Sequence, residues 1–72
     1  MSERLDQVAG LYDEVAAELD QAAAHARTAA EHFRAEEVPR GAAHALAARG
    51  HLLEAQERLD TQAREHARNS RP

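Results

Sequence analysis

The chain has 72 residues, a formal net charge of −4 and no cysteine. Disulfide bonds are therefore excluded, and a chain of this length forms at most one small domain. Alanine accounts for 18 residues, so few side chains are large enough to build a core. A single small core of this kind seldom gives more than about 3 to 5 kcal/mol of stability, which favours self-association.

The first predicted element is a long helix over residues 3–36, with Ser2 as its N-cap and the acids Glu3 and Asp6 in its first turn. Its apolar residues are separated by alternating steps of three and four, which is a heptad pattern when Leu5 is taken as position a. Positions a and d are Leu5, Val8, Tyr12, Val15, Leu19, Ala22, Ala26, Ala29 and Phe33, and position e is Ala9, Ala16, Ala23 and Ala30. This apolar stripe is wide enough to meet two neighbouring helices.

A short turn at residues 37–38 is predicted next, because the residue before a proline avoids helical geometry and Pro39 suits the first turn of a helix. The second helix is predicted over 39–68, followed by a frayed tail at 69–72. Its expected buried side consists of Ala42, Ala45, Leu46, Leu52, Leu53, Ala55, Leu59 and Ala63. Residues 1–72 are thus expected to form one all-α domain, a coiled-coil-like antiparallel hairpin.

In such a hairpin, residues whose numbers sum to about 76 lie at the same height. The alanines of residues 22–30 then receive the leucines of the second helix, and Gly50 lies opposite Ala26 to allow close approach. The first two turns of helix 1, in contrast, face a stretch in which Ala67 is the only apolar residue. We therefore expect a second chain to cover them.

The expected oligomer or partner interface is Leu5, Val8, Leu11, Tyr12, Val15 and Leu19. A homodimer that closes a four-helix bundle is the favoured interpretation, because it covers these residues with another copy of the same pattern. The alternative is a docking surface for a different protein, bound as a helix in a groove. Either interpretation predicts a small adaptor or regulator that acts by binding.

Histidines form a second pattern, since His25 and His32 are seven residues apart, as are His44 and His51. The hairpin pairs His25 with His51 and His32 with His44. These pairs suggest a metal-binding bundle as an alternative function, although the Glu-x-x-His motif of di-metal bundles is missing from the sequence. The other interpretations are boundary histidines that pack their rings, or a pH sensor, because five protons would change the formal charge from −4 to +1.

Enzymatic chemistry has little support in the sequence. No hydroxyl residue lies where a histidine and an acid would converge, and there is no glycine-rich phosphate loop, so no catalytic residue and no cofactor are assigned. An RNA- or DNA-binding hairpin dimer is a lesser alternative, disfavoured by the net charge of −4 and by only one tyrosine and one phenylalanine. No membrane span or signal peptide is recognised, and we expect a cytoplasmic protein.

Overall fold

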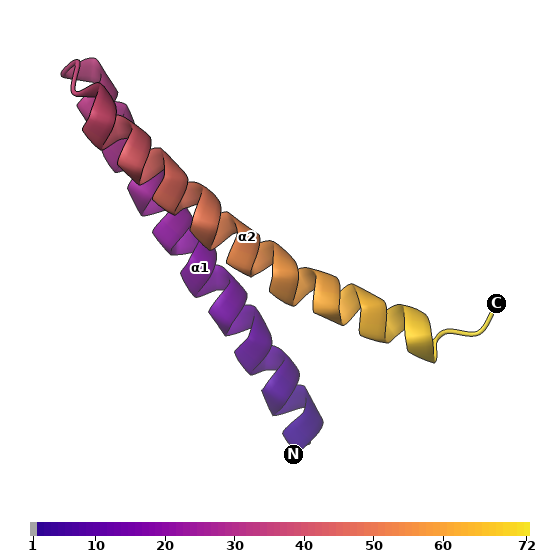
Figure 1. Ribbon diagram of the computed structural model, residues 1–72. Coiled ribbons are helices and arrows are strands. Elements are labelled where there is room, and N and C mark those ends of the chain that lie inside the picture. Colours follow the sequence, from indigo (N-terminus) through magenta and orange to yellow (C-terminus); the bar gives the residue numbers. More distant parts are fainter. Residues whose placement is uncertain (1) are drawn as a thin grey trace.

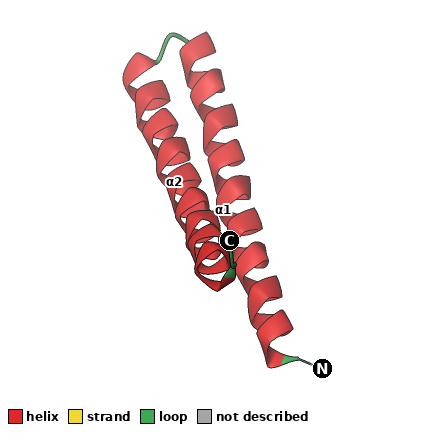
Figure 2. Cartoon of the chain, turned by 90° about the vertical axis from the view of Figure 1, so that its right-hand side faces the viewer, coloured by secondary structure: helices red, strands yellow, loops and turns green. Residues whose placement is uncertain are grey.

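The computed structural model describes residues 2–72 and consists of two helices of equal length. Helix α1 covers Glu3–Arg34 and helix α2 covers Val38–Asn69, and no β-strand occurs in residues 2–72. The helices run antiparallel from the turn and diverge toward the two termini (Figures 1 and 2). The hairpin extends over 53 × 30 × 12 Å. Two long helices packed against each other confirm the all-α hairpin predicted from the heptads.

Helix α1 begins as its sequence predicts. Ser2 is the N-cap in extended geometry, and its side-chain oxygen accepts a hydrogen bond from the Leu5 N–H at 3.4 Å. Glu3 and Asp6 place negative charge in the first turn, where the exposed N–H groups of the helix favour it.

The turn between the helices is a Schellman motif centred on Glu36. Helix α1 ends at Arg34, two residues earlier than predicted, because Glu36 adopts the left-handed region with φ of 61°. The Glu37 N–H donates to the His32 carbonyl at 2.8 Å, and the Glu36 N–H donates to the Phe33 carbonyl at 3.0 Å. These two bonds satisfy carbonyls that the end of the helix would otherwise leave free.

Helix α2 begins one residue before the predicted Pro39. Glu37 is its N-cap and Val38 its first residue, and proline is tolerated in this first turn because no helical N–H partner is needed there. The helix ends at Asn69, after which the Ser70 hydroxyl donates to the His66 carbonyl at 2.8 Å.

The contact between the helices uses different residues from those predicted. The buried residues are Val15 and Ala29 of α1, and Gly41 and Ala55 of α2. Most of the half-buried residues recur beside them at steps of three and four: Val8, Leu11, Glu18, Ala22, His25 and His32 on α1, and His44, Ala48, His51, Arg58 and Gln62 on α2. Helix α1 therefore faces its partner helix with heptad positions d and g.

This orientation corrects the predicted core. Of the residues expected on the buried side of helix 2, only Ala55 is buried, and Leu46, Leu52, Leu53 and Leu59 are all exposed. Position a of α1 is also turned outward, so that Leu5, Tyr12, Leu19 and Phe33 are exposed. Small residues at the contact, rather than leucines, let the two backbones approach.

The glycine that permits this approach is Gly41 and not Gly50. A Cβ placed on Gly41 would lie 2.8 Å from the Phe33 ring, whereas a Cβ on Gly50 would have nothing within 4 Å. The prediction that Gly50 marks a close approach is therefore wrong. This close approach lies beside the turn, where the chain itself brings the helices together.

Candidate functional site

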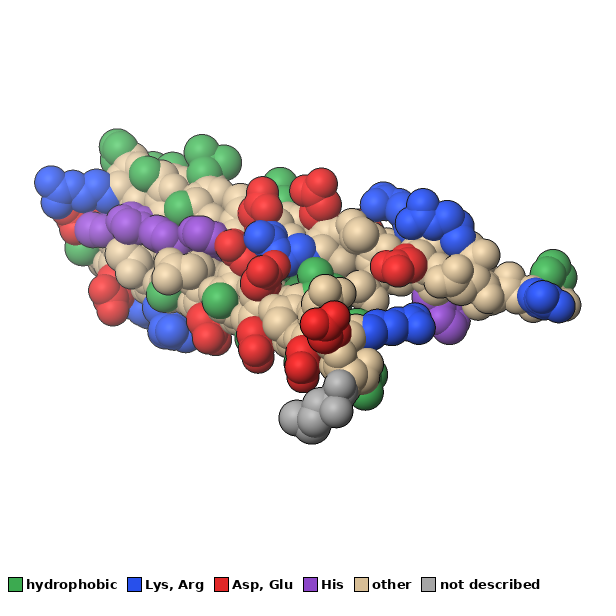
Figure 3. All heavy atoms as spheres, turned by 90° about the horizontal axis from the view of Figure 1, so that it is seen from below, with side chains coloured by type: hydrophobic (Ala, Val, Ile, Leu, Met, Phe, Trp, Pro, Cys, Tyr) green, Lys and Arg blue, Asp and Glu red, His purple; other side chains and the backbone are tan. Residues whose placement is uncertain are grey.

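One side of the hairpin carries a row of four stacked imidazoles. The rings follow the order His51, His25, His44, His32, with centroid separations of 5.5, 5.3 and 5.3 Å. Figure 3 shows this row as a continuous purple band along the closed half of the molecule. The row draws on both helices, because positions 25 and 32 of α1 and positions 44 and 51 of α2 face the same side.

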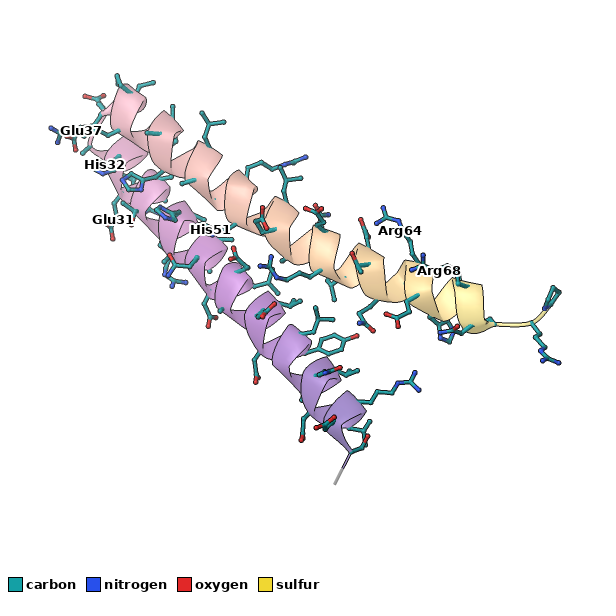
Figure 4. The ribbon with its side chains drawn as sticks, turned by 60° about the horizontal axis from the view of Figure 1, so that its bottom comes forward. Glu31, His32, Glu37, His51, Arg64 and Arg68 are labelled. Atoms are coloured by element: carbon teal, nitrogen blue, oxygen red, sulfur yellow. The ribbon has the colours of Figure 1, made fainter. Side chains whose placement is uncertain are left out.

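A carboxylate is hydrogen-bonded to the histidine at each end of the row. Nδ1 of His51 donates to the Glu18 carboxylate at 2.7 Å, and Nδ1 of His32 donates to Glu37 at 3.3 Å. In Figure 4, His32 lies close to Glu37 at the turn, with His51 further along the hairpin. In the middle of the row, the Nδ1 atoms of His25 and His44 are 3.0 Å apart. One of these two nitrogens must donate and the other accept.

The histidines of each predicted pair lie next to each other, but the direct nitrogen contact joins one histidine from each pair. His25 stacks on His51 and His32 stacks on His44, whereas the direct nitrogen contact joins His25 to His44. The contact between His25 and His44 was not predicted from the sequence. His44 lies seven residues, or two helical turns, from His51, the residue that the level pairing places beside His25. The shared spacing of seven on both helices is the signal that could have revealed it.

The histidines and carboxylates of the row do not bring three metal ligands together at one point. Within residues 2–72, no group of three or more histidine or acidic side chains converges closely enough to hold an ion. The Nδ1 atoms of the four histidines are instead engaged in pairs, His25 with His44, His32 with Glu37 and His51 with Glu18. The arrangement joins α1 to α2 through polar contacts.

An ion pair continues the polar side beyond the histidines. Arg58 of α2 donates to Glu14 of α1 at 3.3 Å and to Glu54 of its own helix at 3.1 Å. Hydrogen bonds to Glu14 and then to Glu54 raise the pKa of Arg58 above its ordinary value. The Glu54–Arg58 pair joins residues four apart on α2, a spacing that favours ion pairs on a helix, and the Glu14–Arg58 pair joins the two helices.

A shallow hollow of about 360 Å³ lies where the helices diverge. It is lined by Arg4, Gln7, Val8, Leu11, Gln62, Glu65, His66 and Asn69. Val8 and Leu11, both assigned to the partner interface from sequence, are half-buried here beside polar side chains of α2. Their surroundings are mostly charged or amide groups, which is unlike an apolar ligand pocket.

The opposite side of the hairpin is apolar. At 3.5 residues per turn, heptad positions a and g lie roughly 50° to either side of position d. Because d faces α2 and the histidines occupy g, position a projects from the other side of the hairpin. On α2, Gly41 and Ala55 face α1 as position d does on the first helix. The equivalents of position a therefore come four residues later, at Ala45 and Leu59. The exposed large side chains on this side are Leu5, Tyr12, Leu19, Phe33, Val38, Leu52 and Leu59, here termed the apolar face.

Three of the six residues predicted as the interface belong to the apolar face, namely Leu5, Tyr12 and Leu19. Val15 does not, because its side chain is only 5% exposed and packs inside the hairpin. The face also extends further than predicted, since Phe33 and Val38 carry it to the turn. The sequence placed Phe33 in an internal core and Val38 in the turn.

The extent of exposed surface is large for a chain of this mass. The hairpin has 5790 Å² of accessible surface. A compact monomer of 7.9 kDa would expose about 4,400 Å². The excess of about 1,400 Å² is of the size that one subunit buries in a stable protein interface, typically about 800 Å² per partner or more.

Comparison of the chain with known protein families, with curated proteins and with solved structures finds no match. Neither helix in residues 2–72 combines the length and the apolar character needed to cross a membrane. The candidate site is therefore defined by the geometry above: an apolar face on one side of the hairpin and a hydrogen-bonded histidine row on the other.

Proposed function

We propose that this protein is a non-enzymatic helical interaction module that works as a homodimer, with two hairpins forming a four-helix bundle. The observation that carries the proposal is the apolar face. Among residues 2–72 only Val15, Ala29 and Ala55 form a buried hydrophobic core, while nine large hydrophobic side chains are exposed, seven of them on the apolar face. An exposed surface of this kind favours association with another protein surface.

A second copy is the occupant that best matches the size and chemistry of the face. Both helices contribute apolar residues to it, so two faces brought together bury four helices around one core. The excess surface is also comparable with the area that each subunit of a dimer buries. The histidine row remains on the outside of this assembly, where its hydrogen bonds join the helices of each hairpin.

Sedimentation equilibrium of the full chain tests the proposal. We expect a mass of about twice 7.9 kDa for the natural sequence. The variant Leu19→Glu, which places a charge in the middle of the apolar face, should shift the mass toward one chain. Ala17→Glu is the matched control, because it adds the same charge at an exposed position of the same helix turn that lies outside the apolar face.

Two results would overturn the proposal. One is a single-chain mass for the natural sequence up to its solubility limit. The other is equal dissociation by Leu19→Glu and Ala17→Glu, which would locate the contact away from the apolar face. A single-chain mass together with tight binding of a different protein at Leu19 would favour the docking alternative.

A further inference from the structure

The sizes and charges of the side chains along the exposed side of α1 indicate how two copies fit together. Resting on the proposed homodimer, we infer that α1 of one hairpin packs antiparallel against α1 of the second copy, around a two-fold axis that passes beside Leu19. The two turns then lie at opposite ends of the bundle. Three neighbouring heptad columns of α1, at positions a, e and b, point to this arrangement.

The central residues at position a match in size when α1 is paired with an antiparallel copy of itself. The residues at position a are Leu5, Tyr12, Leu19, Ala26 and Phe33, and four of the five are large and exposed. Antiparallel pairing about Leu19 sets Tyr12 against the partner's Ala26 and Leu19 against the partner's Leu19. At the two ends, Leu5 meets the partner's Phe33. The largest side chain at the centre of the column thus meets the smallest, which allows both to be covered without a clash.

Position e lies next to position a and is alanine at every repeat: Ala9, Ala16, Ala23 and Ala30. The same two-fold axis pairs Ala9 with the partner's Ala30 and Ala16 with the partner's Ala23. Because alanine has the smallest side chain after glycine, two such columns let helix axes approach toward the lower end of the usual range, about 8 Å. A second copy of α1 satisfies this requirement along the whole helix.

Position b lies at the margin of the apolar face. Its charges are of opposite sign to those they meet when α1 is paired with an antiparallel copy of itself. The column reads Asp6, Asp13, Asp20, Arg27 and Arg34, acidic in its first half and basic at its end. Antiparallel pairing brings Asp13 near the partner's Arg27 and Asp6 near the partner's Arg34. All five residues are exposed, and no ion pair within residues 2–72 involves any of them. Asp20 meets its own copy at the axis, and this is the one unfavourable charge contact.

Helix α2 is consistent with the same axis. The stacked pairs His25–His44 and His25–His51 place the level of Leu19 in α1 close to Leu52 in α2. About the axis, Leu52 meets the partner's Leu52, and Ala45 meets the partner's Leu59. A small residue again faces a large one, as it does in α1.

The other arrangements are less favourable. If the two turns lay at the same end, α1 would pack on the partner's α2. Asp13 would then approach the partner's Asp60. A parallel pairing of the two α1 helices would align Asp13 with the partner's Asp13 and Arg27 with the partner's Arg27. Like charges at a contact select against a geometry more strongly than exposed ion pairs stabilise one.

Disulfide trapping tests the geometry, because the natural chain has no cysteine. Under mild oxidation, Leu19→Cys should form a covalent dimer with itself. Tyr12→Cys should not, since antiparallel α1 helices hold the two copies of position 12 about 20 Å apart at 1.5 Å per residue. A mixture of Tyr12→Cys and Ala26→Cys should give the mixed disulfide.

Charge exchange provides a second test that does not depend on disulfide geometry. Asp13→Arg should weaken the dimer about tenfold, because two favourable pairs become repulsive in each assembly. Adding Arg27→Asp should recover most of this loss at an unchanged net charge. If Asp13→Arg instead tightens the dimer, α1 packs beside the acidic part of the partner's α2 and the inferred arrangement is wrong.

The outcomes separate this inference from the proposed function. A single-chain mass for the natural protein overturns both. A dimer mass, combined with self-linking of Tyr12→Cys or with linking of Leu19→Cys only to Leu52→Cys, keeps the homodimer and overturns the antiparallel α1 contact.

Discussion

The aromatic ring of Phe33 lies over the backbone of Gly41, across the turn that joins the two helices. A Cβ at position 41 would be 2.8 Å from two carbons of that ring, closer than side chains pack. Gly41 is buried, whereas Phe33 remains half-exposed. The contact shows that Phe33 covers the closed end of the hairpin with one edge and contributes to the apolar face with the rest of its ring.

This contact predicts different effects for the same substitution at two glycines. Gly50→Ala should increase the free energy of unfolding by about 0.5 to 1 kcal/mol, because alanine is the better helix former and the site has open space. Gly41→Ala should give a smaller gain or a loss, since the Phe33 ring must move. Urea unfolding at one fixed protein concentration measures both. If Phe33 is responsible, the Gly41→Ala gain returns in a Phe33→Ala background.

The turn predicts a stabilising substitution at Glu36. This residue adopts a φ of 61°, a conformation that costs a residue with a Cβ about 1 kcal/mol. Glu36→Gly should therefore raise the free energy of unfolding by about 1 kcal/mol, as glycine is the usual residue at this position of a Schellman motif. Glu36→Ala removes the same carboxylate and keeps the Cβ. Thermal unfolding that shows equal shifts for the two variants would contradict the role assigned to the backbone.

The buried position Ala55 is expected to be intolerant of a larger side chain. Ala55 is only 1% exposed between the helices, so Ala55→Leu should force them apart and lower the free energy of unfolding by about 1 to 3 kcal/mol. Ala43→Leu is the control, because it makes the same change at an exposed position of α2. Denaturant unfolding of both variants at equal concentration decides whether α2 faces α1 through Ala55.

The middle of the histidine row predicts unequal tautomers. The Nδ1 atoms of His25 and His44 are 3.0 Å apart, and a hydrogen bond between them requires a hydrogen on only one of the two. At a pH where both rings are neutral, one ring should carry its hydrogen on Nδ1 and the other on Nε2. Nitrogen-15 chemical shifts of the imidazoles report this directly. His44→Ala should remove the difference at His25, and identical tautomers in the natural chain would exclude the bond.

Local signals in the sequence predicted much of the backbone. Ser2 caps α1, Pro39 lies in the first turn of α2, and Glu54 pairs with Arg58, all as their positions indicate. The side-by-side histidines also follow from the spacing of seven residues on each helix and one reversal of the chain. These features depend on residues close together in sequence or on helical period alone, which is why they were predictable.

The end of α1 was less predictable, because Glu36 is not a residue that ordinarily marks a left-handed turn. The burial of Gly41 was missed for a related reason. A glycine inside a helix gives no sign of whether another side chain lies against it, and Gly41 and Gly50 differ only in their neighbours in space.

Two long helices, with a broad apolar stripe on the first, follow from the residue pattern alone. Which part of that stripe turns inward depends on how the two helices pack together. Heptad spacing defines the period of a helix but not its rotation about its own axis when three adjacent columns, at positions a, d and e, are all apolar. Pairing of Val15 and Ala29 with the small residues Gly41 and Ala55, together with the histidine row, turns position d toward α2. Leu5, Tyr12, Leu19 and Phe33 are consequently left on the surface.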